Sequence, residues 1–154
     1  MTENQYLLNI INKYIASQIS DIILRNTLQG LLLEIQQWAN SYLLDIYTSG
    51  SRAKGTAIKG NSDIDFLISL SSTTPGTLCE IYDSLYNWLN TKGYQVRKQD
   101  VSLGIAYYGY NIDLVPARKQ SGHTNYHSLE FNFYFELHWN FNHFGNSNWY
   151  IERM

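Results

Sequence analysis

The sequence predicts an α+β domain in which a mixed β-sheet is covered by helices on one side. The order of the expected elements carries this prediction: two amphipathic helices, two strands separated by a loop, a third helix, and then further strands. The length of 154 residues is the second observation, because it is enough for one compact domain and too short for two. We therefore expect residues 1–154 to form a single domain.

The first part of this domain, residues 1–42, is expected to be helical. Apolar side chains recur with the spacing of an amphipathic helix over residues 5–19. A second helix is expected from Asp21, a good N-cap residue, to about Tyr42. We interpret the apolar stripes of both helices as core-facing positions.

Residues 43–116 are expected to form the core of the domain. Two strands are predicted over 43–47 and 64–70, and the helix that follows them is expected to be capped by Thr74 and to stop at Gly93. Further strands are predicted over 94–98, 101–108 and 110–115. This order suits a mixed sheet with its helices on one side.

Two aspartates, Asp63 and Asp65, stand two positions apart at the start of the second predicted strand. In a strand their carboxylates leave the same face, while the apolar residues between and after them point the other way. Two carboxylates on one face repel each other unless a cation lies between them. Mg²⁺ takes oxygen ligands of this kind, so the pair predicts a magnesium site.

A turn of small residues, Gly50-Ser51, precedes these acids. Backbone N–H groups exposed in such a turn are suited to binding phosphate. A short helix is expected to begin at Ser51, with its N-terminal N–H groups directed at the phosphates. Arg52 and Lys54 add positive charge to the same loop. A phosphate-binding turn beside metal-binding carboxylates points to nucleotide chemistry.

The combination of these motifs resembles the nucleotidyltransferase superfamily, which includes DNA polymerase β, the CCA-adding enzymes, the oligoadenylate synthetases and the cyclic-dinucleotide synthases. The family signature is a Gly-Ser or Gly-Gly, a spacer, and then Asp-x-Asp or Asp-x-Glu between apolar residues. This sequence matches it at Gly50, Ser51, Asp63 and Asp65. The resemblance is greatest to the oligoadenylate, cyclic-dinucleotide and CCA-adding branch. The alternative is an ordinary hairpin turn followed by a polar strand.

The resemblance also implies a third acid on an adjacent strand, and Asp113 fits that place. It stands in an apolar run that ends at Pro116, where burying a carboxylate is costly unless it is paired or bound to metal. The alternative is an aspartate that is satisfied by backbone groups at a strand end. Asp45 and Asp100 have no such surroundings, and we expect both at the surface.

The resemblance implies an enzyme that transfers a nucleoside monophosphate from a nucleoside triphosphate to an acceptor hydroxyl, with release of pyrophosphate, by a two-Mg²⁺ mechanism in which Mn²⁺ can replace Mg²⁺. The acceptor, whether nucleotide, RNA or protein, is left open. The implied catalytic and metal-binding residues are Asp63, Asp65 and Asp113, and the implied nucleotide-binding residues are Gly50, Ser51, Lys54 and Arg52.

The last part, residues 117–154, departs from the family. From Leu129 to Phe144 aromatic residues alternate with polar ones, which is typical of a strand. In the related enzymes a helical domain follows the third acid, and we expect none here. An aromatic strand face must be covered in a soluble protein. We expect a homodimer or a separate helical partner to cover it, unless the tail packs on its own sheet.

Because residues 117–154 differ from the family pattern, an alternative function stays open. The chain can be an inactive or weak nucleotide-binding module, truncated or frame-altered relative to a longer protein, or acting with a separate partner subunit. The tail does not suggest a second metal site, because its histidines lack acids or cysteines at ligand spacing. We expect packing or surface positions for His127, His138 and His143.

Composition limits the partners and the compartment. The net charge of −2 excludes a general basic surface for long nucleic acid. Basic residues near Asp113 supply only local charge for a triphosphate or an acceptor; they are Arg97, Lys98, Arg118 and Lys119. The single cysteine, Cys79, cannot form an intrachain disulfide, which favours the reducing cytoplasm. No stretch is apolar over enough residues to span a bilayer.

Overall fold

The computed structural model describes residues 2, 5, 8–9, 25–50, 63–122, 126–129, 135–141 and 147–153. The helix expected over 5–19 and the N-cap expected at Asp21 lie almost wholly outside these residues. In the last three segments, only His127 has a described side chain.

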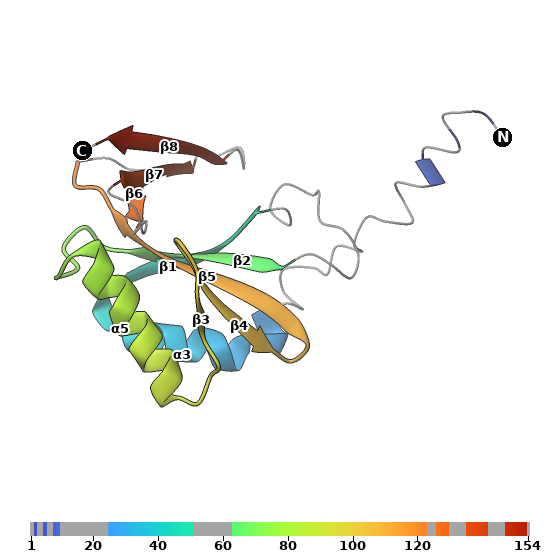
Figure 1. Ribbon diagram of the computed structural model, residues 1–154, viewed down its shortest axis with the longest axis horizontal. Helices are drawn as coiled ribbons and strands as arrows, with labels where there is room; N and C mark the ends of the chain where they lie inside the picture. The colour runs from blue at the N-terminus through green and yellow to red at the C-terminus, as the bar shows by residue number, and fades with distance from the viewer. Residues whose placement is uncertain are drawn as a thin grey trace.

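The described strands form one mixed sheet (Figure 1). Its order is β1-β2-β5-β6-β7-β8, with β4 also paired to β5 and β3 to β4. Only β2 and β5 pair in parallel; the other pairs are antiparallel. The strands are β1 Leu43–Ser49, β2 Ile64–Leu70, β3 Arg97–Lys98, β4 Leu103–Tyr107, β5 Tyr110–Lys119, β6 Tyr126–Leu129, β7 Phe135–Phe141 and β8 Ser147–Arg153.

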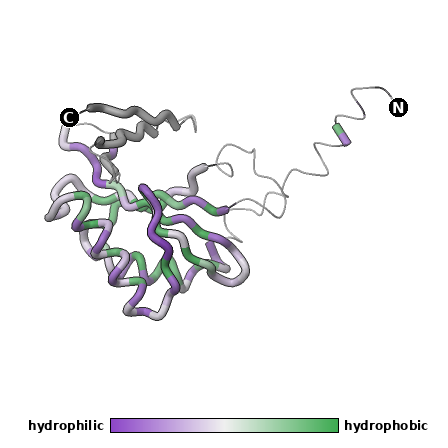
Figure 2. Tube along the Cα trace, viewed as in Figure 1, coloured by the Kyte–Doolittle hydropathy of each residue, from purple (hydrophilic) through white to green (hydrophobic). Residues whose placement is uncertain are grey.

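The helices α3 (Gln29–Ala39) and α5 (Leu78–Thr91) lie together on one face of the sheet (Figure 1). Both are amphipathic, and Figure 2 shows hydrophobic and hydrophilic residues alternating along them. A short 3₁₀ turn, Asn40–Tyr42, connects α3 to β1, so the helix ends before the expected Tyr42. The α+β class, with a mixed sheet and helices on one side, is confirmed.

The period-two pattern of β2 separates two apolar layers. Its even-numbered apolar residues are buried against the helices, with Ile35 of α3 and Leu85 of α5 among their neighbours. These β2 residues are Ile64, Phe66, Ile68 and Leu70. A smaller cluster of Leu67, Val115 and Ala117 lies on the opposite face. The acids of β2 and β5 share the face of this second cluster, away from the helices.

The N-cap of α5 is Thr77, so the prediction of Thr74 is wrong. The Thr77 hydroxyl accepts a hydrogen bond from the backbone N–H of Glu80 at 3.2 Å, and the Thr77 N–H donates to the Glu80 carboxylate at 2.6 Å. This is a capping box, and its backbone hydrogen bond lowers the pKa of Glu80. The Thr74 hydroxyl instead donates to the carbonyl of Ser71 at 2.7 Å, and Pro75 precedes the helix.

The edge of β5 is divided between two partners. β4 pairs with its first half, from Tyr110 to Leu114, and β6 pairs with its last residues, from Ala117 to Lys119. This second pairing explains why β5 continues beyond the expected end at residue 115. The expected strands at 94–98 and 101–108 are both shorter, as β3 and β4.

The tail adds three antiparallel strands to this sheet, β6, β7 and β8. Of the predicted aromatic strand, Phe131 and Phe133 lie outside the described residues, and Phe135 begins β7. A side-chain hydrogen bond connects β6 to β2. The Ser69 Oγ and His127 Nε2 atoms are 2.7 Å apart, and both residues are buried. His127 is a packing residue, as expected.

This contact spans the neighbouring strand. Ser69 pairs with Ala117 in β5, and Ala117 pairs with Leu129 in β6, two positions from His127.

Ser69→Ala is expected to lower the free energy of unfolding by about 1–3 kcal/mol, because it leaves a buried polar atom of His127 without this partner. Chemical denaturation measures the change. Ser72→Ala, the same substitution at an exposed loop position, serves as the control. Equal stability of both variants would contradict the role of the contact.

Candidate active site

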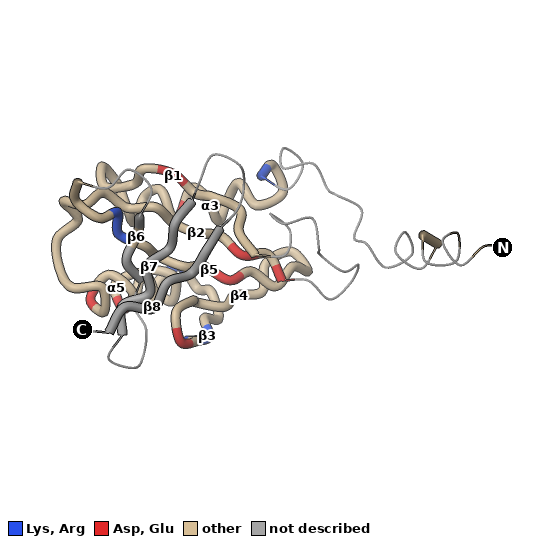
Figure 3. Tube along the Cα trace, turned by 90° about the horizontal axis from the view of Figure 1, so that it is seen from above, with Lys and Arg blue, Asp and Glu red and all other residues tan. Residues whose placement is uncertain are grey.

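Two acids meet where β2 and β5 run side by side. The parallel register pairs Asp65 with Asp113, and both are partly buried. Asp63 is exposed and immediately precedes β2. Figure 3 shows the acidic positions gathered on these neighbouring strands. The structure therefore brings the three sequence-predicted acids into one region.

The electrostatics of these acids are coupled. Burial raises the pKa of Asp65 to about 6, and the charges of Asp113 and Asp63 add to the effect. Burial also raises the pKa of Asp113, again with a contribution from Asp63. Neighbouring negative charge therefore adds to the cost of ionising Asp65 and Asp113.

The donor set suits a hard cation. Carboxylate oxygens are the ligands that Mg²⁺ prefers, and a cation would relieve the repulsion that adds to the effect of burial on the pKa of Asp65. Within the described ranges, no three His, Cys, Asp or Glu side chains stand close enough to hold a metal ion as they are. Shared coordination by all three acids thus stays a prediction, while their proximity is a feature of the structure.

Gly50 lies against this acidic group. It directly follows β1, whose last residue, Ser49, pairs with Asp65. Its φ of +69° favours glycine, and a Cβ there would lie 2.7 Å from the Asp65 Cγ and 3.2 Å from its Cβ. The backbone of Gly50 therefore lies so close to the Asp65 carboxylate that a residue with a Cβ would displace it.

The rest of the predicted phosphate loop lies outside the described residues. This applies to Ser51, Arg52 and Lys54, and to the helix expected to begin at Ser51. The nucleotide-binding role of these residues, and of Gly50, remains a prediction.

Gln99 contacts the acidic group, although it was not among the residues predicted from the sequence. Its Nε2 donates to the Asp113 Oδ1 at 3.0 Å. A Cβ at Gly104 would lie 2.7 Å from this nitrogen and 3.1 Å from the same Oδ1, so the glycine makes room for the contact. A glycine inside a predicted strand is the signal that could have indicated a close approach.

Of the basic residues expected near Asp113, Arg97 is the one whose charge lowers the pKa of that acid. Lys98 pairs with Asp83 at 2.6 Å. Arg118 donates to the Gly76 carbonyl at 2.6 Å, in the loop before α5. Lys98 and Arg118 thus hold α5 and its preceding loop to the sheet.

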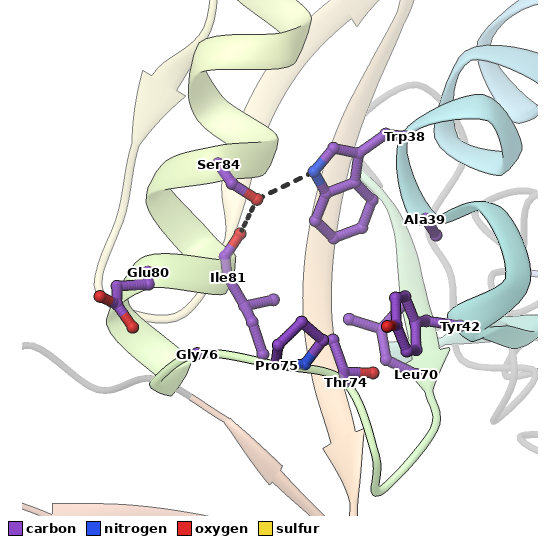
Figure 4. A pocket seen from close by; sticks show the side chains of 10 residues that line it. All are labelled: Trp38, Ala39, Tyr42, Leu70, Thr74, Pro75, Gly76, Glu80, Ile81 and Ser84. Atoms are coloured by element: carbon purple, nitrogen blue, oxygen red, sulfur yellow. Dashed lines mark hydrogen bonds between the residues drawn. The ribbon is translucent and has the colours of Figure 1, made fainter.

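A separate cavity of about 440 Å³ lies at the other end of β2, between α3 and α5 (Figure 4). The Trp38 Nε1 donates to the Ser84 Oγ at 2.9 Å in its wall. The described residues that line it include Leu70 and Pro75 and no lysine or arginine. These lining residues supply no positive charge for a triphosphate.

The family comparison agrees with the site. The family model of the nucleotidyltransferase domain matches residues 31–131, which include all three acids and Gly50. No curated protein matches the sequence. No helix in the described part of the chain is long and apolar enough to cross a membrane.

Solved structures share the fold. CdnC from E. coli MS115-1 with ATP superposes with a TM-score of 0.62 at 22% identity, covering 88% of this chain and 48% of that chain. CdnE cyclic dinucleotide synthase from Elizabethkingia meningoseptica, with GTP and Apcpp, gives 0.60 at 14% identity, covering 97% and 55%. The Cid1 poly(U) polymerase with MgGTP gives 0.55 at 18% identity, covering 73% and 36%. The chain thus spans about half or less of these proteins.

Asp65→Asn is expected to stabilise the metal-free protein at neutral pH. The pKa of Asp65 is about 6 in the folded state, against an ordinary value of 3.8. The stability that the protonated carboxyl contributes is therefore fully present below about pH 4 and is lost as the pH rises through 6. The increase in the free energy of unfolding caused by Asp65→Asn should therefore be largest above about pH 6 and vanish near pH 4. Thermal unfolding with a chelator across the range measures it. Asp100→Asn, at an exposed acid, should show no such trend.

Gly50→Ala is expected to abolish nucleotide turnover, because its Cβ displaces the Asp65 carboxylate. The positive φ alone costs about 1–2 kcal/mol in stability. Gly122→Ala separates the two effects, since Gly122 has a φ of +79° with nothing within 4 Å of an added Cβ. Both variants should lose stability, and only Gly50→Ala should lose turnover. Equal turnover in the two would contradict this assignment.

Proposed function

Because the chain belongs to the nucleotidyltransferase domain family, we propose that it transfers a nucleoside monophosphate from a nucleoside triphosphate to an acceptor hydroxyl, with release of pyrophosphate. The observation that carries the proposal is the parallel register that sets Asp65 beside Asp113, with Asp63 close enough to raise the pKa of both. Partly buried carboxylates gathered in this way are costly in a purely structural role.

Asp63, Asp65 and Asp113 are the proposed ligands of Mg²⁺, with Mn²⁺ as a substitute. When bound, the metal supplies positive charge that polarises the attacked phosphate and lowers the pKa of the acceptor hydroxyl. The Cid1 structure was obtained with MgGTP, which supports the choice of ion. The oxygen-only donor set of this chain supports it independently.

The proposed reaction forms one bond and breaks another. The acceptor oxygen attacks the α-phosphorus, the bond from that phosphorus to the β-phosphate oxygen breaks, and the hydroxyl proton passes to water. Gly50 is proposed to bind the triphosphate through its backbone N–H. Ser51, Lys54 and Arg52 are proposed to bind the β- and γ-phosphates through a hydroxyl and positive charges.

The substrates proposed for testing are ATP and GTP. CdnC was solved with ATP, and CdnE with GTP and Apcpp. The first acceptor proposed for testing is another nucleotide, and RNA and protein are the other two classes. Cys79 is the single cysteine of the sequence and cannot form an intrachain disulfide, which is consistent with the reducing cytoplasm as the proposed place of action.

A second candidate is a weak or inactive nucleotide-binding module. Activity then depends on a second copy of the chain or on a separate helical subunit. CdnC has also been solved in complex with a HORMA protein. Light scattering of the purified chain tests the homodimer.

Asp63→Asn is expected to reduce pyrophosphate release from ATP or GTP by at least about 10²-fold at saturating Mg²⁺, because it removes a proposed metal ligand. Asp63 is exposed, so the fold should persist, and thermal unfolding checks that it does. Radiolabelled nucleotide and a coupled pyrophosphate assay measure turnover, with Asp100→Asn as the matched control. Calorimetric nucleotide binding without turnover in the wild type would favour the second candidate.

A further inference from the structure

The side chain of Gln99 holds one oxygen of the proposed metal-binding group. Its Nε2 lies 3.0 Å from the Asp113 Oδ1, and Gln99 is only partly exposed. A carboxylate can only accept, so the amide group facing it must be the donating nitrogen. This orientation agrees with the other end of the side chain, where the Ser102 hydroxyl donates to the Gln99 Oε1 at 2.9 Å.

The backbone of Gln99 is held independently of its side chain. Its N–H donates to the Ser102 carbonyl at 3.0 Å, and its carbonyl accepts from the Tyr82 hydroxyl at 2.8 Å. The same hydroxyl lies 3.0 Å from the Ser102 carbonyl, so its one proton is shared between the two carbonyls. Tyr82 is buried on α5, so these bonds fix the residue to the core. The side-chain amide is therefore not needed to hold the loop.

The neighbouring strand is shaped to admit this contact. Gly104 pairs with Asp113 in the β4–β5 ladder. A side chain there would occupy the space in which the Gln99 amide and the Asp113 carboxylate meet. A glycine in the middle of a strand weakens it, so the contact has a cost in local stability.

We propose that Gln99 is a positioning residue, which orients the Asp113 carboxylate for the metal ion through the bond from Nε2 to Oδ1, with Ser102 fixing the amide. The inference rests on the proposed function. With Oδ1 committed to the amide, rotation of the carboxylate about its Cβ–Cγ bond is restricted. The acid is thus held in one orientation in spite of the repulsion from its neighbours.

The test uses Gln99→Met, which keeps the length of the side chain and removes the donor. Mn²⁺ binding to the whole chain, followed by electron paramagnetic resonance without nucleotide, gives a readout that does not depend on turnover. Loss of an outer hydrogen bond to a ligand typically costs 10–100-fold in affinity or activity, and we expect Mn²⁺ binding to weaken by about this factor. In turnover assays kcat should fall while KM for the nucleotide stays near the wild-type value.

Two further variants complete the test. Ser102→Ala releases the amide without removing it, so it should weaken Mn²⁺ binding in the same direction and by less. Gln95→Met makes the same substitution at an exposed position of the same segment and should bind Mn²⁺ like the wild type. Thermal unfolding confirms that each variant is folded.

The outcomes separate the inference from the proposed function. Mn²⁺ binding that is weakened by Gln99→Met and Ser102→Ala, but not by Gln95→Met, supports the inference. Normal Mn²⁺ binding and kcat in a folded Gln99→Met variant overturn it and leave the proposed function standing. A wild-type chain that binds no Mn²⁺ overturns the proposed function, and the inference falls with it.

Discussion

The parallel pairing of β2 with β5 is the constraint on which the rest of the structure depends. It sets Asp65 against Asp113 on one face and stacks Phe66 and Leu114 on the other. A shift of one residue would exchange the two faces, placing carboxylates in the apolar layer under the helices. The burial of that layer against α3 and α5 therefore fixes the register, and the register fixes the site.

The core also holds together a group of charges that repel. Residues of β2 and β5 that face the helices, such as Ile64 and Ile112, are fully buried. Their hydrophobic stabilisation, about 25 cal/mol for each Å² of apolar surface, offsets the cost of crowding acids on the opposite face. A well-packed layer behind the sheet is thus what permits an unfavourable arrangement in front of it.

Local rules were sufficient to predict part of this structure. The alternation around Asp63 and Asp65 indicated a strand with its acids on one face, and the apolar run around Asp113 indicated a second. The pairing of these strands and the contact of Gln99 with Asp113 depend on residues far apart in sequence, so no local pattern contains them. The N-cap of α5 could have been predicted from the sequence, since Thr77-x-x-Glu80 is a capping-box pattern.

The divided edge of β5 has a consequence for how the tail joins the sheet. β4 ends its pairing at Leu114 and β6 begins at Ala117, so Val115 and Pro116 form a seam between two sets of partners. The acids and Gln99 lie on the upstream side of this seam. The acids are therefore aligned by strand pairs that precede the attachment of the tail, and the strands after Lys119 join the sheet beyond the segment of β5 that carries Asp113. The buried contact of Ser69 with His127 is a place where the tail meets the strand that carries Asp65.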